Sequence, residues 1–261
     1  MILMKIGLIS DIHSNLEGLQ TVLQELKERE VDKIFCCGDI VGYGPDPTKC
    51  IETLSKTASS LPLSSVKGNH DGAVLGEADP HRFNSMGRKA INWTKRRLGR
   101  KERSFLKGLD FEKKLDDHPI YLVHGSPVDP VWEYIISKSD AYRAFLRLNS
   151  EGEDVRLALF GHSHIPSLFV SEKNDLTEKN VEDGLEVSLD EEKRYLINPG
   201  SVGQPRDRDW RTSFALLEVD RSGKPQRVSF HRREYKAEQV RGKILQAGLP
   251  QKLGDRLLSG I

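Results

Sequence analysis

The N-terminal part of the sequence repeats one pattern: a short apolar run, then a loop, then apolar side chains at helical spacing. Residues 5–9 form the first run, and the apolar residues that follow it at helical spacing are Leu16, Leu19, Val22, Leu23 and Leu26. Residues 33–37 form a second run before a helix predicted near residues 48–55, and residues 63–66 form a third run before another loop. Repeated strand and helix units predict a parallel sheet with right-handed crossovers and helices on its faces. We therefore expect an α/β fold.

The rest of the sequence indicates a different strand pattern. Further strands are predicted at residues 121–123, 157–160, 167–170, 194–197, 213–219 and 227–230. Residues 220–223, between the last two strands, suit a hairpin turn, so this half is expected to be mostly antiparallel. A chain of 261 residues lies within the range of one α/β domain. We expect a single domain over residues 1–261, with a charged excursion at about 172–193 and a C-terminal helical tail at about 236–261.

Composition argues against several classes of protein. The 40 Lys and Arg residues nearly balance the 39 Asp and Glu residues, so no global field draws the chain to nucleic acid or to an anionic membrane. The sequence has no apolar run of transmembrane length, and its opening residues lack the features of a secretory signal. Its three cysteines lack the CxxC spacing of a metal or redox site. We expect Cys36, Cys37 and Cys50 to be buried core residues of a cytoplasmic protein that has no membrane partner.

Two segments depart from this overall charge balance. Residues 82–103 hold nine basic side chains and one acid, whereas residues 172–193 hold nine acids and three lysines. The basic segment is expected to be a solvated helix face around Trp93, with a phosphate-attracting rim as the alternative. The acidic segment ends in alternating apolar side chains and is expected to be an exposed hairpin.

Five short windows rich in His, Asp, Asn and Gly each follow a predicted strand directly. In chain order they are Asp11-Ile12-His13, Gly38-Asp39, Gly68-Asn69-His70-Asp71, His124-Gly125 and Gly161-His162-Ser163-His164. Since ligands of such sheets bind at the carboxyl ends of strands, we expect the windows to converge on one rim of the fold. Carboxylate, imidazole and amide groups without a thiolate suit Mn, Fe, Co or Zn. The windows therefore predict a metal site.

Two details of the windows concern the local backbone. In Asp11-x-His13 and in His162-x-His164, an extended backbone would direct both side chains of the pair to the same side, so that two donors face one ion. Glycines in the windows are expected to let the backbone approach an ion or a phosphate closely. These glycines are Gly38, Gly68, Gly125 and Gly161.

In this order the five windows resemble the signature of the calcineurin-like metallophosphoesterase superfamily, which is DxH, GD, GNH followed by an acid, a lone H, and GHxH. Residues 197–206 read INPGSVGQPR and are similar to the small bacterial and archaeal branch of that superfamily. The resemblance implies a two-layer β-sandwich flanked by helices, with a two-metal site on its rim.

By position, the resemblance implies that seven side chains hold two divalent transition metal ions, which could be Mn, Fe, Co, Ni or Zn. The first ion would be bound by Asp11, His13 and His164, the second by Asn69, His124 and His162, and both by the bridging Asp39. His70 resembles the family's histidine beside the phosphate, which protonates the leaving group or stabilises developing charge. Two such ions lower the pKa of a bound water, and the resulting hydroxide attacks phosphorus in line.

One window departs from the protein phosphatase branch, in which the GD window continues with a second Asp and an Arg. Here Gly38-Asp39 is followed by Ile-Val-Gly-Tyr-Gly, and both of those residues are missing. The departure argues against phosphoprotein specificity. It also leaves His70 in need of another hydrogen-bond partner, for which Asp71 or a backbone carbonyl is the expected one.

Several residues outside the windows are expected to face the substrate. Arg206 could offer a forked contact to a phosphate and Ser201 a hydrogen bond, although the turn that holds them could equally serve only to support the metal-binding loops. Tyr43, Trp132 and Trp210 lie near the windows and could stack a base, or could serve only in packing.

Together these features predict a metal-dependent phosphoesterase that acts on a small phosphate ester or a nucleotide, either as a phosphodiesterase or as a phosphoanhydride hydrolase. The sequence has neither a nucleophile-elbow serine nor a P-loop.

A nuclease is the first alternative, supported only by the basic residues 82–103. A non-catalytic scaffold of the same fold is the second, and the presence of every ligand and of His70 argues against it. The sequence does not specify the oligomeric state.

Overall fold

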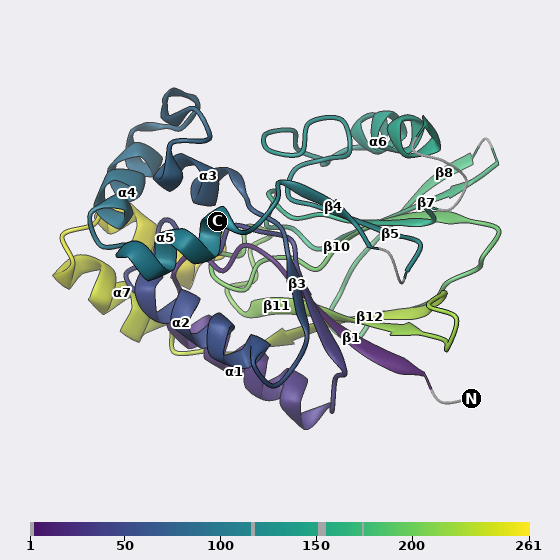
Figure 1. Ribbon diagram of the computed structural model, residues 1–261, viewed down its shortest axis with the longest axis horizontal. Helices are drawn as coiled ribbons and strands as arrows, with labels where there is room; N and C mark the ends of the chain where they lie inside the picture. The colour runs from purple at the N-terminus through teal and green to yellow at the C-terminus, as the bar shows by residue number, and fades with distance from the viewer. Residues whose placement is uncertain (1–2, 116–117, 151–154, 174) are drawn as a thin grey trace.

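The computed structural model describes residues 3–115, 118–150, 155–173 and 175–261. Within these residues, twelve strands form two six-stranded sheets that face each other (Figure 1). The first sheet contains, from edge to edge, β3 (Leu63–Ser65), β2 (Lys33–Cys36), β1 (Met4–Ile9), β11 (Thr212–Val219), β12 (Pro225–Arg233) and β9 (Glu186–Ser188). The second contains β4 (Glu112–Lys114), β5 (Ile120–Val123), β6 (Leu157–Leu159), β10 (Arg194–Asn198), β7 (Ser167–Glu172) and β8 (Asp175–Lys179). The expected α/β fold with a two-layer sandwich is confirmed.

Strand pairing follows the sequence prediction in part. β1, β2 and β3 are parallel neighbours, as the repeated units predict, and β11 and β12 form the predicted hairpin. The prediction of a mostly antiparallel second half is wrong for β6, which lies parallel to both β5 and β10. The reason is that α6 (Lys138–Ser150) lies between β5 and β6 in the chain and provides the crossover that parallel strands need.

β1, β2, β5 and β6 read as apolar runs because their side chains are mostly buried on both faces of the sheet, whereas the edge strands β4 and β8 are largely exposed. In β1, Ile6 and Leu8 pack between the two sheets, whereas Ile9 packs against the helices outside the first sheet. Those helices are α1 (Leu16–Glu28) and α2 (Pro47–Ala58), and α6 covers the outer face of the second sheet (Figure 1). All three cysteines are buried and unpaired, as expected.

Helices from two distant parts of the chain gather at one end of the sandwich, on the left in Figure 1. The first part supplies α3 (Asn69–Leu75), the short helix η1 (Pro80–Arg82), α4 (Ser85–Lys95) and α5 (Arg100–Lys107). The second is the C-terminal tail, with α7 (Ala237–Gln246), α8 (Gln251–Asp255) and the short helix η2 (Arg256–Leu258). Trp93 of α4 is buried between them and donates its ring N–H to the carbonyl of Ala247 at 2.8 Å.

The acidic segment is not a single hairpin, which corrects that expectation. β8 pairs with β7 in the second sheet, whereas β9 pairs with β12 in the first sheet. The segment therefore forms one edge of each sheet, and residue 174 within it lies outside the described residues. Among the residues described, we find no helix with the length and apolar composition needed to cross a bilayer.

Candidate metal centre and substrate cleft

The five windows meet at one end of the sandwich because each follows the carboxyl end of a parallel strand. The windows after β1, β2 and β3 come from the first sheet, and those after β5 and β6 come from the second. In the described part of the chain, their His and Asp side chains form three overlapping buried groups whose ligand atoms lie within 4.8 Å of one another. The groups are Asp11, His13 and His164; His13, Asp39 and His70; and Asp39, His124 and His162.

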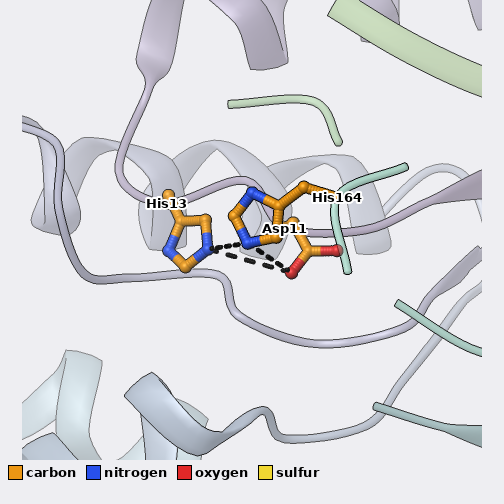
Figure 2. A group of neighbouring side chains, drawn as sticks. All are labelled: Asp11, His13 and His164. Carbon is orange, nitrogen blue, oxygen red and sulfur yellow. Dashed lines mark hydrogen bonds and ion pairs between the residues drawn. The ribbon is translucent and has the colours of Figure 1, made fainter. Parts of the chain in front are cut away.

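Figure 2 shows the first group, in which three donor atoms converge. The Nε2 atoms of His13 and His164 lie 3.1 Å apart. Oδ1 of Asp11 lies 3.8 Å from Nε2 of His13 and 3.3 Å from Nε2 of His164. This buried oxygen has no hydrogen-bond partner among the described residues. An unpaired carboxylate oxygen beside two imidazole nitrogens fits a divalent cation.

Asp39 links the first group to the group that contains His124 and His162. Oδ2 of Asp39 lies 3.5 Å from Nε2 of His13 and 3.4 Å from Nε2 of His124. Oδ1 of Asn69 lies 3.1 Å from the same nitrogen of His124. Oδ1 of Asp39 accepts the backbone N–H of His70 at 2.9 Å, which fixes the orientation of the carboxylate. Asp39 therefore stands between the two groups, and the structure brings all seven expected ligands together.

Backbone carbonyls orient the imidazoles of the cluster. Three of the histidines place Nδ1 against a carbonyl oxygen: His13 against Val41 (3.3 Å), His124 against Cys37 (2.8 Å) and His164 against Gln204 (2.6 Å). Because a carbonyl oxygen only accepts, the proton lies on Nδ1 and Nε2 faces the cluster. His162 has the opposite arrangement. Its Nε2 lies 3.2 Å from the carbonyl of Trp132, so the proton lies on Nε2 and the lone pair of Nδ1 is free to bind a metal ion. Orienting hydrogen bonds of this kind are typical of metal-binding histidines.

Burial acts against every charge in the cluster. It raises the pKa of Asp11 to about 6 and lowers the pKa of His13. Burial also disfavours a charge on Asp39, but the charges of His124 and His70 outweigh it and lower the pKa of Asp39. For His124 burial is likewise outweighed, because the Asp39 carboxylate raises the pKa of His124 to about 9. A proton and a metal ion therefore compete for Nε2 of His124.

The backbone at the ligands is left-handed rather than extended, which corrects the alternation argument. The φ angles are 51° at Asp11, 46° at His13, 52° at Asp39, 65° at His162 and 62° at His164. Asp11 and His13 do face one group, but His162 and His164 face different groups. Tight left-handed turns, and not the two-residue repeat of a strand, direct these side chains.

The window glycines make room for protein atoms rather than for an ion or a phosphate, which corrects a second expectation. A Cβ atom on Gly68 would lie 2.0 Å from Oδ1 of Asp39. One on Gly161 would lie 2.8 Å from Oδ2 of Asp11. The other two window glycines meet backbone atoms in the same way. Glycine is required here because the ligand-bearing loops pack directly on one another.

His70 lies beside the metal ligands, but Asp71 is not its hydrogen-bond partner. The carboxylate of Asp71 instead accepts the backbone N–H groups of Ile40, Val41 and Gly68 at 2.9 to 3.1 Å. These three backbone donors, from the loops after β2 and β3, hold the Asp71 carboxylate in place. Within the described residues, Nδ1 of His70 has no hydrogen-bond partner.

Ring packing positions His70 instead. Its centroid lies 4.2 Å from that of Tyr43, 4.7 Å from that of Phe83 and 4.8 Å from that of His13. Burial lowers the pKa of His70 to about 4, although the charge of Asp39 opposes this effect. The role of Phe83 was not predicted, because a single aromatic residue between helices has no diagnostic spacing.

Above the metal ligands lies a cleft of about 220 Å³. Its lining includes the expected Tyr43, Trp132 and Arg206, together with His70. The guanidinium carbon of Arg206 lies 5.8 Å from the centre of the Tyr43 ring. Trp210 is not in the cleft, because it packs against Tyr235 of the C-terminal tail.

Ser201 does not line the cleft, and its expected contact with the substrate is wrong. The residue is 0% exposed. Its hydroxyl donates to the backbone carbonyl of Asp11 at 2.8 Å and accepts the backbone N–H of Gln204 at 2.8 Å. The side chain therefore supports the metal-binding loops, as the alternative interpretation of this turn had it.

The cleft also contains residues that the sequence did not single out for this role. Tyr134 stacks on His162 with 4.0 Å between ring centroids and 20° between planes. Arg82 lies over the Trp132 ring at 4.4 Å, and Asn84 lies nearby on the lining. Arg82 belongs to the basic segment, whose charge gave a signal for a phosphate rim but not for this residue.

Comparison with known proteins identifies the family of this site. Residues 4–222 match the calcineurin-like phosphoesterase superfamily domain. The chain belongs to the calcineurin-like phosphoesterase superfamily. Members of this superfamily are metal-dependent phosphoester hydrolases, so the family assignment and the donor set of the site agree.

Three relatives extend over nearly the whole chain. An uncharacterised protein of Methanocaldococcus jannaschii is 38% identical over 260 residues and covers 98% of both chains. A metallophosphoesterase from Sphaerobacter thermophilus, solved by crystallography, is 36% identical, with a TM-score of 0.83 and full coverage of both chains. A hypothetical protein from Pyrococcus horikoshii shares the fold, with 22% identity, a TM-score of 0.75 and 99% coverage of both chains.

Proposed function

We propose that this protein hydrolyses a small phosphodiester or a nucleotide phosphoanhydride with the help of two divalent transition metal ions. One observation carries the proposal: two groups of buried donors share Asp39 at the base of a cleft. Asp11, His13 and His164 would hold the first ion, and Asn69, His124 and His162 the second. When bound, such ions lower the pKa of a water molecule and neutralise charge on the phosphate oxygens.

The residues around the ligands have distinct tasks in this proposal. His70 lines the cleft next to the ligands and gives a proton to the oxygen that leaves phosphorus. Burial lowers the pKa of His70 to about 4, so the ring is neutral near pH 7 without substrate. The negative charge of a bound phosphate would favour the protonated ring, which takes its proton from solvent before giving it to the leaving oxygen. Arg206 reaches the cleft from the loop after β10 and neutralises a phosphate oxygen.

The cleft supports a small substrate over nucleic acid. A volume of about 220 Å³ suits a phosphate group with a modest substituent. Of the nine basic residues in 82–103, Arg82 alone is found on the described lining of the cleft, so the segment gives little support to a nuclease. Binding of single-stranded DNA that falls steeply as salt rises would favour the nuclease instead.

A hydrolysis panel tests the proposal. The protein is assayed with Mn, Ni, Co, Zn and Mg against model mono- and diesters, cyclic nucleotides, dinucleoside polyphosphates and single-stranded DNA. We expect hydrolysis of a diester or a phosphoanhydride that depends on added metal. No hydrolysis with any metal, together with no bound metal in elemental analysis, would favour a non-catalytic scaffold.

Asp39→Asn tests the shared ligand. The substitution weakens the carboxylate that lies beside both His13 and His124, so we expect loss of activity together with reduced metal occupancy. Asp110→Asn changes an exposed aspartate and serves as the control. Full activity and full occupancy in Asp39→Asn would refute the bridging role.

A further inference from the structure

Two arginine side chains lie together beside the substrate cleft. Arg206 lines the cleft, and Arg256 begins η2 at the end of the C-terminal tail. Both reach the same neutral acceptor, because Oε1 of Gln204 lies 3.0 Å from Nη2 of Arg206 and 3.5 Å from Nη1 of Arg256. One amide oxygen is thus shared by two positive charges.

Neither arginine has a carboxylate partner within 4.0 Å in the part of the chain that the structure describes. The Nε atoms of both side chains are buried and, among the same residues, have no hydrogen-bond acceptor. Arg241 on the same tail differs, since it pairs with Asp255 at 2.8 Å. The pair at the cleft therefore combines like charge with unused donors.

This arrangement is unfavourable without an anion. Burial and the neighbouring charge of Arg206 lower the pKa of Arg256, although Tyr43 opposes the shift. Guanidinium groups bind phosphate through two parallel N–H bonds, and buried donors without acceptors cost free energy. A phosphate group next to the pair would satisfy the unused donors and relieve the repulsion.

The position of the pair relates it to the metal centre. The ring of Tyr43 lies near both, since its centre is 5.8 Å from the guanidinium carbon of Arg206 and 4.7 Å from the centroid of the His13 ring. Arg206 lines the same cleft as Asp39, His162 and His164, so a phosphate at the arginines and a phosphate at the metal ligands would share one cleft, as neighbouring groups of one substrate do.

We propose that Arg206 and Arg256 form a second phosphate subsite, which binds the phosphate group adjacent to the one that is hydrolysed. The preferred substrates would then contain a diphosphate or longer chain, as nucleotide phosphoanhydrides do. This proposal rests on the proposed phosphoesterase function. Gln204 holds both guanidinium groups in place and is a positioning residue.

Pyrophosphate binding tests the subsite without relying on activity. Isothermal titration calorimetry is carried out on protein treated with EDTA, because pyrophosphate binds free divalent ions. We expect Arg256→Met to weaken pyrophosphate binding at least about tenfold, as removal of a charged hydrogen bond does. Arg256→Lys keeps the charge and should weaken it less. Arg241→Met removes a paired charge from the same tail and should leave binding unchanged.

A kinetic comparison tests the substrate preference. In the metal-loaded enzyme, we expect Arg256→Met to lower kcat/KM for diadenosine tetraphosphate at least about tenfold and to change kcat/KM for bis-p-nitrophenyl phosphate, which has one phosphate, by less than about twofold. Equal effects on both substrates would overturn the subsite, and so would unchanged pyrophosphate binding in the variant. If the wild-type protein binds pyrophosphate through Arg256 but hydrolyses neither substrate, the proposed function fails while the subsite stands.

Discussion

Five of the side chains that face the metal centre sit on left-handed backbone, a conformation that costs about 1 to 3 kcal/mol for a residue other than glycine. Hydrogen bonds between neighbouring loops hold this conformation in place. The backbone N–H groups of Asp11 and His13 donate to the carbonyls of Gly38 and Asp39 at 3.0 and 2.9 Å. The loops after β1 and β2 thus fix each other, and the ligands are oriented before any ion binds.

His70→Ala tests the role of a single residue that touches the cleft without being an expected ligand. The His70 side chain packs against rings, and the hydrogen bond from His70 to Asp39 comes from its backbone N–H, which alanine keeps. Removal of the side chain should therefore leave the metal ligands in place. We expect metal content close to that of the wild type and a kcat lower by about 10²- to 10⁴-fold, the usual contribution of a general acid. Elemental analysis and steady-state kinetics measure the two quantities.

His81→Ala, which removes an exposed histidine of η1, is the control for this experiment. It should change neither metal content nor kcat. A His70→Ala protein that has lost its metal would contradict the role of a proton donor and indicate a ligand instead.

At the scale of elements, the loop after β10 forms hydrogen bonds with the metal-binding loop after β1 and supports it. The backbone N–H groups of Val202 and Gly203 donate to the carbonyls of Ser10 and Asp11, both at 2.9 Å. This loop also places the carbonyl of Gln204 against His164. The loop that follows β10, a strand of the second sheet, therefore sets the position of the metal-binding loop after β1.

Gly203→Ala tests this support. A Cβ atom on Gly203 would lie 1.8 Å from the backbone oxygen of Ile12, so the loop with Asp11 and His13 would have to move. We expect a loss of stability of about 1–3 kcal/mol, typical of overpacking, together with weaker metal binding. Chemical denaturation and metal titration measure the effects.

Gly242→Ala is the matched control, since a Cβ atom there meets nothing within 4 Å and Gly242 lies within α7. It should raise the stability by up to about 1 kcal/mol through helix propensity. Equal stability losses in the two variants would show that the close approach at Gly203 is not the cause.

His231 of β12 should make the free energy of unfolding of the protein depend on pH. Burial lowers the pKa of His231 to about 4, and the charges of Arg29 and Arg233 act in the same direction. The unfolded chain takes up this proton near the ordinary pKa of 6.5, so the contribution of His231 to stability is complete above that pH and is lost as the pH falls toward 4. We expect His231→Gln to have a shallower loss of stability between pH 6.5 and 4 in denaturation curves. Identical slopes in both proteins would contradict this expectation.

At the scale of the whole molecule, the metal centre joins the two sheets. Asp11, His13 and Asp39 follow strands of the first sheet, whereas His124 and His164 follow strands of the second. The closest donor contacts, such as the 3.1 Å between the Nε2 atoms of His13 and His164, cross between the sheets. Ions bound here would link the sheets and would bind only to the folded chain.

Added metal should therefore raise the melting temperature. For a ligand that binds only the folded state, a concentration of 100 Kd adds about 2.7 kcal/mol of stability. We expect calorimetric melting temperatures to rise with Mn concentration in the wild type and to rise less in Asp39→Asn. A melting temperature that does not respond to any divalent transition metal would argue against the centre.

Much of the fold and of the metal centre is predictable from the sequence, because both depend on local patterns. Apolar runs define the strands, and the position of each window directly after a strand places its donors at one edge of the sandwich. The chemistry of the donors, carboxylate, imidazole and amide, is a property of the residues themselves. The sandwich and the assignment of the seven ligands came from the resemblance of the windows to a known family.

Contacts between distant segments were decided by the tertiary structure alone. The pairing of β9 with β12, the rings around His70 and the approach of Arg256 to Arg206 join residues that have no common pattern along the chain. Such contacts form when distant segments pack together. The C-terminal tail, for example, packs over one end of the sandwich and so brings Arg256 to Arg206. Which groups carry the chemistry follows from the residue types along the chain. What surrounds those groups depends on the fold, because burial and neighbouring charge arise only when distant segments pack together.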